Sequence, residues 1–295
     1  MRSPLLLLLV AVTRAQDYEK VQIGTEPVAD GVWMLTGAGG NIGVSAGPDG
    51  VFLIDDQYAP LTEKIRAAVA KISDRPIRFV LNTHFHGDHT GGNENLGKTG
   101  VLIVAHDNVR TRLNTEQFNA FFNRKTPPAP AAALPVVTFS EAVTFHLNGD
   151  EIHCFHVPPA HTDGDAVVTF RKADAVHMGD LFFNGLYPFI DTGAGGSLDG
   201  MIAASDLVLA RTDAKTRIIP GHGPLGDRAA LQSYRDMLAG VRGRIRPLVE
   251  AGKTLEEIRA ARPTAEWDEK WGKGFMKPDS FVGIVVDGMR QRAPR

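Results

Sequence analysis

The feature that most constrains this chain is a group of four possible metal ligands within six residues, His84-Phe85-His86-Gly87-Asp88-His89. An apolar run over residues 77–81 leads into this segment and predicts a buried strand. Residues two apart in an extended segment point the same way, so His84 and His86 can reach one metal ion. Gly87 lets the backbone turn, which allows the acid and the histidine after it to reach a second ion. The spacing therefore predicts two adjacent metals where a strand becomes a loop.

Three more candidate ligands lie in similar settings. His161 lies between two predicted strands, and Asp180 and His222 each follow one. Rigid scaffolds place functional groups in such loops. The full set of candidate ligands is His84, His86, Asp88, His89, His161, Asp180 and His222. Histidine and carboxylate donors without a thiolate suit zinc, although iron and manganese also bind such sites, and we expect two zinc ions per chain.

The other five histidines lack this setting, and we expect none of them to bind metal. They are His106, His146, His153, His156 and His177. His177 lies three residues before Asp180. It is therefore the best candidate among them to support a ligand by a hydrogen bond.

The N-terminus predicts an exported protein. Arg2 precedes the apolar run Leu5 to Val12, and a small residue at Ala15 offers a cleavage point, which is typical of a signal peptide over residues 1–15. The run is too short to cross a bilayer, which takes roughly 20 residues. We expect a mature chain from residue 16 that is secreted or periplasmic and not held in a membrane. Cys154 is the only cysteine, so a disulfide within the chain is excluded.

Charge and length narrow the class of partner. A net charge of −2 offers no basic surface for a polyanion, so we expect a small-molecule substrate and no nucleic acid. The 295 residues are enough for one large domain, and no linker or repeat divides residues 16–295. We therefore expect a single domain. The sequence pattern gives no oligomeric state.

Short apolar runs alternate with helical patterns along the chain. Three runs separated by Gly-rich turns are typical of an antiparallel meander: Val32 to Thr36, Ile42 to Ala46 and Val51 to Ile54. Five segments show helical spacing: Pro60 to Ile72, Gly200 to Leu209, Arg228 to Glu250, Leu255 to Ala261 and Ser280 to Met289. Strands followed by a helix, twice over, predict an α+β fold of two packed sheets with helices outside. The C-terminal helices should follow about residue 226.

Residues 106–135 differ in character from the rest of the chain. A helical start through Leu113 leads into Phe118, Phe121 and Phe122 and then into a Pro-rich stretch over residues 127–130. Such a long excursion is either a lid over the site or a surface loop. The three rings have the i, i+3, i+4 spacing of one helix face, which slightly favours burial in the core over contact with a substrate.

Two glycine-rich motifs suggest other chemistries, and neither has the context that it needs. Residues 43–47 match the Gly-x-Ser-x-Gly pattern of serine hydrolases, which requires a strand, a sharp turn and a helix. Here a Pro-Asp-Gly turn and another strand follow, which predicts a hairpin instead. Residues 37–42 begin like a dinucleotide-binding loop, but Ile42 stands where the third glycine belongs, so we expect only a flexible turn.

Together these motifs resemble the metallo-β-lactamase superfamily, and the resemblance covers most of the chain. It rests on five segments: Leu53-Ile54-Asp55, the HxHxDH motif with Thr90-Gly91-Gly92-Asn93 behind it, the His161 loop, Met178-Gly179-Asp180 and Pro220-Gly221-His222-Gly223. The resemblance implies a four-layer αββα sandwich with the site at one edge.

The resemblance also implies how the ligands are shared. His84, His86 and His161 would hold a first zinc, and Asp88, His89 and His222 would hold a second. Asp180 would bridge the two ions, and Asp55 would support the ligands from behind. Two metals about 3.5 to 4 Å apart can share a hydroxide that attacks the carbonyl of an amide or ester. Asp88 would orient this nucleophile.

The substrate is left open, because a fold does not fix it. Asp180 stands where one lactamase subclass carries a cysteine, and a bridging Asp is typical of glyoxalase II. A glyoxalase II would carry a basic glutathione-binding extension, whereas Arg242, Arg244 and Arg246 are typical of ordinary surface charges. The His-Thr-Asp-Gly-Asp loop at His161 and the predicted export favour β-lactamase-like ring opening. A thioester or ester hydrolase of the glyoxalase II type is the alternative, and an iron-bound oxygenase or redox protein is a third. No substrate-binding residue is indicated.

Overall fold

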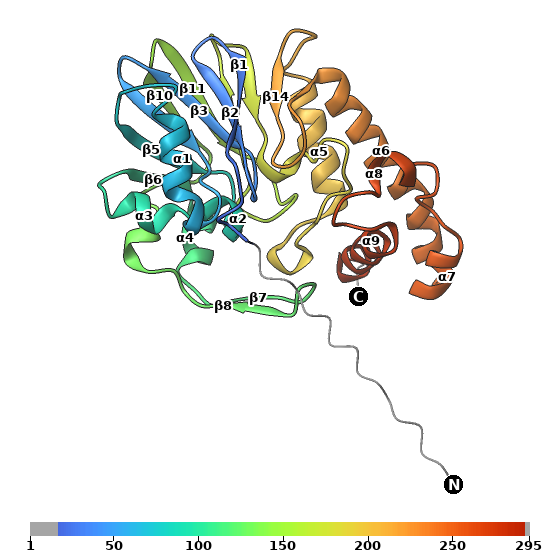
Figure 1. Cartoon of the computed structure of the whole chain (residues 1–295). Coiled ribbons are helices and arrows are strands. Elements are labelled where there is room, and N and C mark those ends of the chain that lie inside the picture. Colours follow the sequence, from blue (N-terminus) through green and yellow to red (C-terminus); the bar gives the residue numbers. More distant parts are fainter. Residues whose placement is uncertain (1–16, 293–295) are drawn as a thin grey trace.

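The structure is a computed structural model that describes residues 17–292, so the predicted signal peptide lies outside the described residues. Two β-sheets pack against each other, and helices flank them on the outside (Figure 1). The α+β class and the four-layer αββα sandwich that the sequence predicted are confirmed.

The first sheet has seven strands in the order β1-β2-β3-β4-β5-β6-β9. The predicted antiparallel meander consists of β2 (Val32–Thr36), β3 (Ile42–Gly47) and β4 (Gly50–Ile54). A further strand that was not predicted, β1 (Gly24–Ala29), pairs antiparallel with β2. Three more strands continue parallel to β4: β5 (Ile77–Asn82), β6 (Leu102–His106) and β9 (Val137–Phe139). Because β3 turns straight back into β4, the Gly-x-Ser-x-Gly segment is a hairpin strand and not the nucleophile turn of a serine hydrolase.

The second sheet has six strands in sequence order. They are β10 (Ala142–Leu147), β11 (Asp150–His156), β12 (Ala166–Phe170), β13 (Ala175–His177), β14 (Arg217–Ile219) and β15 (Gly226–Asp227). The pair β13–β14 is parallel. Asp180 follows β13 and His222 follows β14, so the parallel pairing brings these two residues to the same edge of the sheet.

A layer of apolar side chains between the sheets fixes their relative position. Phe52 and Ile54 of β4 share one cluster with Ile152 and Cys154 of β11 and Val168 of β12, and all five are fully buried. Full burial of one such side chain contributes about 1.5–3 kcal/mol. The loops at the edge of the sandwich are therefore carried by a rigid core.

The helices largely match the predicted segments. On the first half lie η1 (Ala59–Leu61), α1 (Thr62–Val69), α2 (Gly87–Thr90), α3 (Asn93–Gly97) and α4 (Asp107–Leu113). On the second half lie α5 (Leu198–Leu209), α6 (Arg228–Glu250), α7 (Leu255–Ala260), α8 (Asp268–Trp271) and α9 (Pro278–Arg292). The bounds of α6 agree with the prediction, and its buried residues Leu231, Leu238 and Ile245 lie on one stripe seven residues apart. None of the helices described here combines the length and apolar character that crossing a bilayer requires.

Residues 106–135 differ from the prediction that three phenylalanines in this segment lie on one buried helix face. After α4 the segment forms a hairpin of β7 (Gln117–Asn119) and β8 (Arg124–Thr126). Phe118, Phe121 and Phe122 are 56%, 44% and 53% exposed, so the prediction that they are buried in the core was wrong. Spacing of i, i+3, i+4 puts residues on one face only in a helix, whereas here one ring is on a strand and two are in the turn.

Candidate metal centre

All seven predicted ligands meet at one edge of the sandwich. The HxHxDH segment comes from the first sheet, where it follows β5, and its Asp-His pair lies on α2. The second sheet supplies the other three. His161 lies between β11 and β12, Asp180 lies in the 3-10 turn η3 (Gly179–Leu181) after β13, and His222 follows β14. Segments far apart in the sequence therefore form one site.

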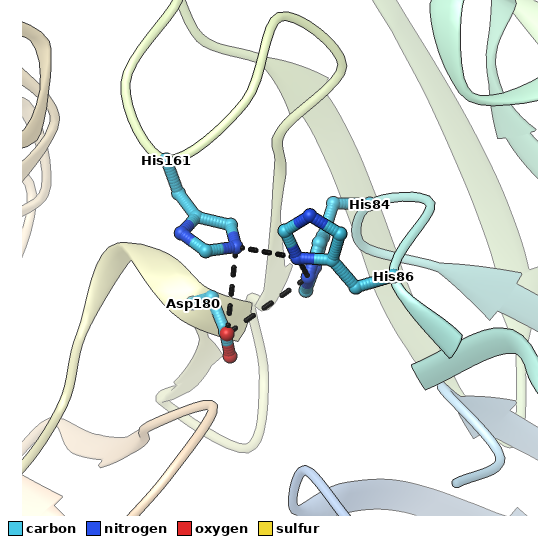
Figure 2. A group of neighbouring side chains, drawn as sticks. All are labelled: His84, His86, His161 and Asp180. Carbon is cyan, nitrogen blue, oxygen red and sulfur yellow. Dashed lines mark hydrogen bonds and ion pairs between the residues drawn. The ribbon is translucent and has the colours of Figure 1, made fainter. Parts of the chain in front are cut away.

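Four of the residues form a first cluster, which consists of His84, His86, His161 and Asp180 (Figure 2). The Nδ1 atom of His86 lies 3.2 Å from Nε2 of His84 and 2.9 Å from Nε2 of His161. The Oδ2 atom of Asp180 lies 3.5 Å from Nε2 of His161 and 3.9 Å from Nε2 of His84. Donors around one tetrahedral zinc lie roughly 3.3 Å apart. The four atoms therefore have the spacing of ligands to a single ion.

The second cluster consists of Asp88, His89 and His222. The Oδ2 atom of Asp88 lies 3.2 Å from Nε2 of His222 and 3.6 Å from Nε2 of His89. Asp180 reaches this cluster as well, because its Oδ1 atom lies 3.1 Å from Nε2 of His89 and 3.4 Å from Nε2 of His222. These distances also suit a single ion.

Asp180 is the residue that joins the two clusters. Its Oδ2 atom faces the first cluster and its Oδ1 atom faces the second. Oδ1 of Asp180 and Nε2 of His89 are buried and make no hydrogen bond in the described part of the chain. Unpaired buried polar atoms are costly, and a metal ion would give both atoms a partner. The donor set thus fits a dinuclear metal site in which the carboxylate is shared.

Two glycines leave space for this arrangement. A Cβ atom at Gly221 would overlap Oδ1 of Asp180, and one at Gly40 would overlap the ring of His89. Larger residues at these positions would push a ligand out of place. Gly221 belongs to the loop of His222, so the same segment supplies a ligand and the space beside another.

Comparison with known proteins identifies the family. The family described as "Metallo-beta-lactamase superfamily" matches residues 35–222, which is more than half of the chain. The chain belongs to the metallo-β-lactamase superfamily. The matched range begins in β2 and ends at His222, so it contains all seven of the clustered residues.

Relatives in the superfamily have diverse names. The "Metallo-beta-lactamase type 2" of Bacillus cereus is 25% identical over 190 residues, which cover 64% of this chain and 69% of that protein. The "Hydroxyacylglutathione hydrolase" of Polaromonas sp. is 27% identical over 164 residues, 55% of each chain. The "2,4-dinitroanisole O-demethylase subunit alpha" of Nocardioides sp. is 26% identical over 164 residues, 55% of this chain and 47% of that protein. The chain thus spans about half the length of the last two relatives.

Two solved structures have the same fold as this chain. The crystal structure of the DIM-1 metallo-β-lactamase has a TM-score of 0.61 and 21% identity, and the match covers 75% of this chain and 99% of that one. The sec-alkylsulfatase Pisa1 from Pseudomonas sp. has a TM-score of 0.68 and 19% identity, with coverage of 90% and 50%. Identities this low establish the fold alone.

Asp55 lies behind both clusters. It is fully buried, and its Oδ2 atom accepts hydrogen bonds from Nδ1 of His89 at 2.7 Å and from Oγ1 of Thr83 at 2.8 Å. The Thr83 hydroxyl lies 3.1 Å from Nδ1 of His84. The carboxylate can only accept, so Nδ1 of His89 carries a proton, and Nε2 is the atom that can bind a metal ion in the second cluster once its own proton is displaced.

Two orienting contacts in the first cluster were not found by sequence reasoning. Nε2 of His86 donates to Oδ2 of Asp191 at 3.0 Å, and Nδ1 of His161 donates to the carbonyl of Phe189 at 2.9 Å. When each ring carries one proton, the atoms of His86 and His161 that face each other are therefore both lone pairs. Lone pairs at 2.9 Å repel unless a cation lies between them, which again fits a metal ion. No local spacing marks Asp191, because it lies in an irregular loop before η4 (Thr192–Ala194).

Asn41 corrects the prediction that residues 37–42 are only a flexible turn. Its amide donates to the carbonyls of Pro220 and Gly223, each at 2.9 Å, and so holds the loop of His222. His177 donates from Nε2 to the Asn41 carbonyl at 3.1 Å and accepts from the Gly179 amide at 3.1 Å. His177 thus lies beside the loops that carry Asp180 and His222. The other four histidines that were not expected to bind metal are in neither cluster: His106, His146, His153 and His156. The turn is ordered because its polar groups meet buried backbone of the second sheet.

The two fully buried histidine rings of the first cluster are uncharged near neutral pH. Burial lowers the pKa of His84, and it lowers the pKa of His161 to about 4. Both rings are therefore unprotonated near pH 7 in the metal-free protein. They can bind a metal ion without first losing a proton.

The second cluster has the opposite character. Burial alone would lower the pKa of both histidines, but the Asp180 and Asp88 carboxylates outweigh it. They raise the pKa of His89 and raise the pKa of His222 to about 9. Burial in turn opposes the charge of the two carboxylates, but the histidines hold the pKa of Asp88 and of Asp180 below the ordinary range. Without metal, this cluster consists of protonated rings facing ionised acids.

Metal loading should therefore occur in two steps, of which the second depends strongly on pH. A metal entering the second cluster must displace protons from His89 and His222, so its apparent affinity should fall as the pH falls. The proton on His222 alone should lower this affinity by roughly tenfold for each pH unit below the His222 pKa of about 9. The first step should change much less. Zinc titration against a chromophoric chelator between about pH 6.5 and 8.5 measures both steps. Two steps with the same pH dependence would contradict the assignment.

Removal of the Asp191 carboxylate should weaken the first cluster. In Asp191→Ala, Nε2 of His86 loses its acceptor, and we expect affinity for the first zinc to fall by about 10- to 100-fold. Competition with a chelator measures this affinity. Asn119→Ala is the matched control: Asn119 donates to the same Asp191 oxygen at 3.2 Å, and its loss leaves the carboxylate in place. Equal affinity in Asp191→Ala and the unaltered protein would show that His86 needs no such partner.

Proposed function

We propose that this protein is a two-metal hydrolase that cleaves an amide- or ester-type carbonyl bond, with ring opening of a β-lactam as the favoured reaction. The observation that carries the proposal is Asp180, whose two oxygens face two different clusters 3.1 to 3.9 Å from the nitrogen donors. A pair of divalent metals supplies a water-derived nucleophile near neutral pH and polarises a carbonyl oxygen. Zinc is the proposed metal, with two ions per chain, because all ligands are imidazoles and carboxylates.

Asp88 is the proposed catalytic residue. Its side chain is 24% exposed, whereas that of His89 in the same cluster is fully buried. It is ionised at neutral pH, because the neighbouring histidines hold its pKa low in spite of burial. A carboxylate at the open side of the site can accept a hydrogen bond from the attacking water and orient it. Asp55 and Asp191 are not in either cluster, and they orient the rings of His89 and His86 by hydrogen bonds.

The alternative is a thioester hydrolase of the glyoxalase II type, supported by the hydroxyacylglutathione hydrolase relatives. Glutathione carries carboxylates, so such an enzyme needs free cationic groups. Three arginines in the second half of α6 are instead paired on the surface: Arg242 and Arg246 with Asp199, and Arg244 with Glu266. These pairs favour a substrate other than a glutathione conjugate. The proposed export and small-molecule substrate agree with a lactam.

A panel of three substrates tests the proposal with zinc-loaded protein. A chromogenic cephalosporin, an acyl-glutathione thioester and a simple lactone would be compared by kcat/KM, with a chelator-treated sample as control. We expect the cephalosporin to be turned over fastest and the chelator to abolish turnover. Preference for the thioester would instead support the alternative. Iron in place of zinc after purification would favour an oxygenase or redox protein on the same fold, which is the third candidate.

A further inference from the structure

The β7–β8 hairpin is hydrogen-bonded to the metal centre. Asn119 at the end of β7 donates from Nδ2 to Oδ2 of Asp191 at 3.2 Å. The same oxygen accepts the hydrogen bond from His86 at 3.0 Å. The hairpin extends from the lower edge of the fold in Figure 1, and this contact joins it to a metal ligand through a single side chain.

The turn of this hairpin carries an aromatic surface toward the ligands. The rings of Phe121 and Phe122 lie 4.9 Å apart, and they lie 5.4 Å and 5.2 Å from the ring of Phe189. Phe189 is buried, and its ring lies 5.8 Å from that of His86 and 5.9 Å from that of His161. The three rings thus form a continuous apolar surface from solvent to the first cluster.

Exposure of the two outer rings shows that the apolar surface is open to a ligand. Phe121 and Phe122 rest on Phe189 and remain 44% and 53% exposed. Aromatic side chains this exposed beside a cluster of polar ligands are typical of a binding site, in which an apolar wall adjoins a few polar groups. Phe118 on the same hairpin is 56% exposed, but it is not among the rings that pack on Phe189.

We propose that Phe121, Phe122 and Phe189 form a subsite for the acyl side of the substrate, which selects carbonyl compounds with an aromatic or branched aliphatic substituent. The hydrogen bond from Asn119 to Asp191 fixes the position of this subsite relative to His86. A substituent lying on the three rings places its carbonyl carbon next to the first cluster. A small acyl group leaves the rings in water and binds more weakly. The inference rests on the proposed function for the identity of the reacting bond.

A pair of hydroxamic acids tests the subsite without turnover. Benzohydroxamic acid and acetohydroxamic acid have the same metal-binding group and differ only in the apolar substituent. Calorimetric titration of zinc-loaded protein should give a dissociation constant about tenfold lower for the benzo compound. The double variant Phe121→Ala/Phe122→Ala should lose most of this ratio, and Phe118→Ala should keep it. All three substituted positions are exposed, and thermal melting verifies that the variants fold.

The outcomes separate this inference from the proposed function. Discrimination that disappears in the double variant supports the subsite, even if none of the three panel substrates is hydrolysed. An unchanged ratio in the double variant, an equal loss in Phe118→Ala, or failure of both compounds to bind would overturn it. Hydrolysis of the panel by a protein that does not distinguish the two hydroxamic acids would uphold the function and refute the subsite.

Discussion

Asp88→Asn should keep the fold and reduce turnover of any hydrolysed substrate by about 10²- to 10⁴-fold. Asparagine has the shape of aspartate, so packing at this partly exposed position changes little. It lacks the negative charge, and its amide nitrogen cannot accept a hydrogen bond from the attacking water. The measurement is kcat at saturating substrate, with the zinc content of each sample determined in parallel.

Zinc content matters because Asp88 also belongs to the second cluster, 3.2 Å from His222. Assays in excess zinc separate lost metal from a lost catalytic group. Asp107→Asn is the control, since it makes the same change at an exposed position at the start of α4. Turnover near the wild-type value in zinc-saturated Asp88→Asn would remove the catalytic assignment.

Asp180→Ala should reduce binding of both metals at once. One carboxylate oxygen faces each cluster, so a single truncation removes a donor from both. It also leaves the protonated rings of His89 and His222 without the carboxylate that raises their pKa. We expect the affinity for each ion to fall at least about tenfold, and the bound zinc after gel filtration to fall accordingly.

His222→Ala is the matched comparison, because His222 belongs to the second cluster alone. It should retain the first zinc and lose the second. Elemental analysis of the two variants would therefore give different stoichiometries. If Asp180→Ala and His222→Ala each lost one ion, Asp180 would be a ligand of one metal and not a shared one.

The ligands could be predicted from the sequence because each lies where a local pattern ends. The HxHxDH segment follows the apolar strand β5, and Asp180 and His222 follow β13 and β14. Local apolar runs predict where each strand lies, and the buried core then fixes the positions of the strand ends. The packing of two sheets with helices outside follows from the same alternation of strands and helices, and the resemblance to the superfamily implied the αββα layering.

The groups that orient the ligands could not be predicted in this way. Asp191 lies 105 residues from His86, in a loop without a regular pattern, and the Phe189 contact uses a backbone carbonyl that any residue would supply. Asn41 was taken for part of a flexible turn, because its partners lie about 180 residues away, at Pro220 and Gly223. Such contacts depend on how the two sheets meet, and this is decided by packing across the whole core.

The hairpin shows where a local pattern misleads. Phe118, Phe121 and Phe122 have helical spacing, but residues 114–126 form a turn and a short hairpin. The Pro-rich stretch after β8 cannot continue a helix, and the nearby Phe189 gives two of the rings a partner outside the core. Tertiary contact at the rim of the site therefore outweighs the local periodicity.

The division of ligands between the sheets links the lifetime of the folded chain to its metal supply. The HxHxDH loop belongs to one half of the sandwich and the other three ligands to the second half, so bound ions tie together segments that separate on unfolding. A metal present at about 1,000 times its dissociation constant adds roughly 4 kcal/mol of stability for one site. Under metal starvation the same chain would lose this contribution and become more accessible to proteases. The amount of folded protein would then depend on the supply of the metal that the two clusters bind.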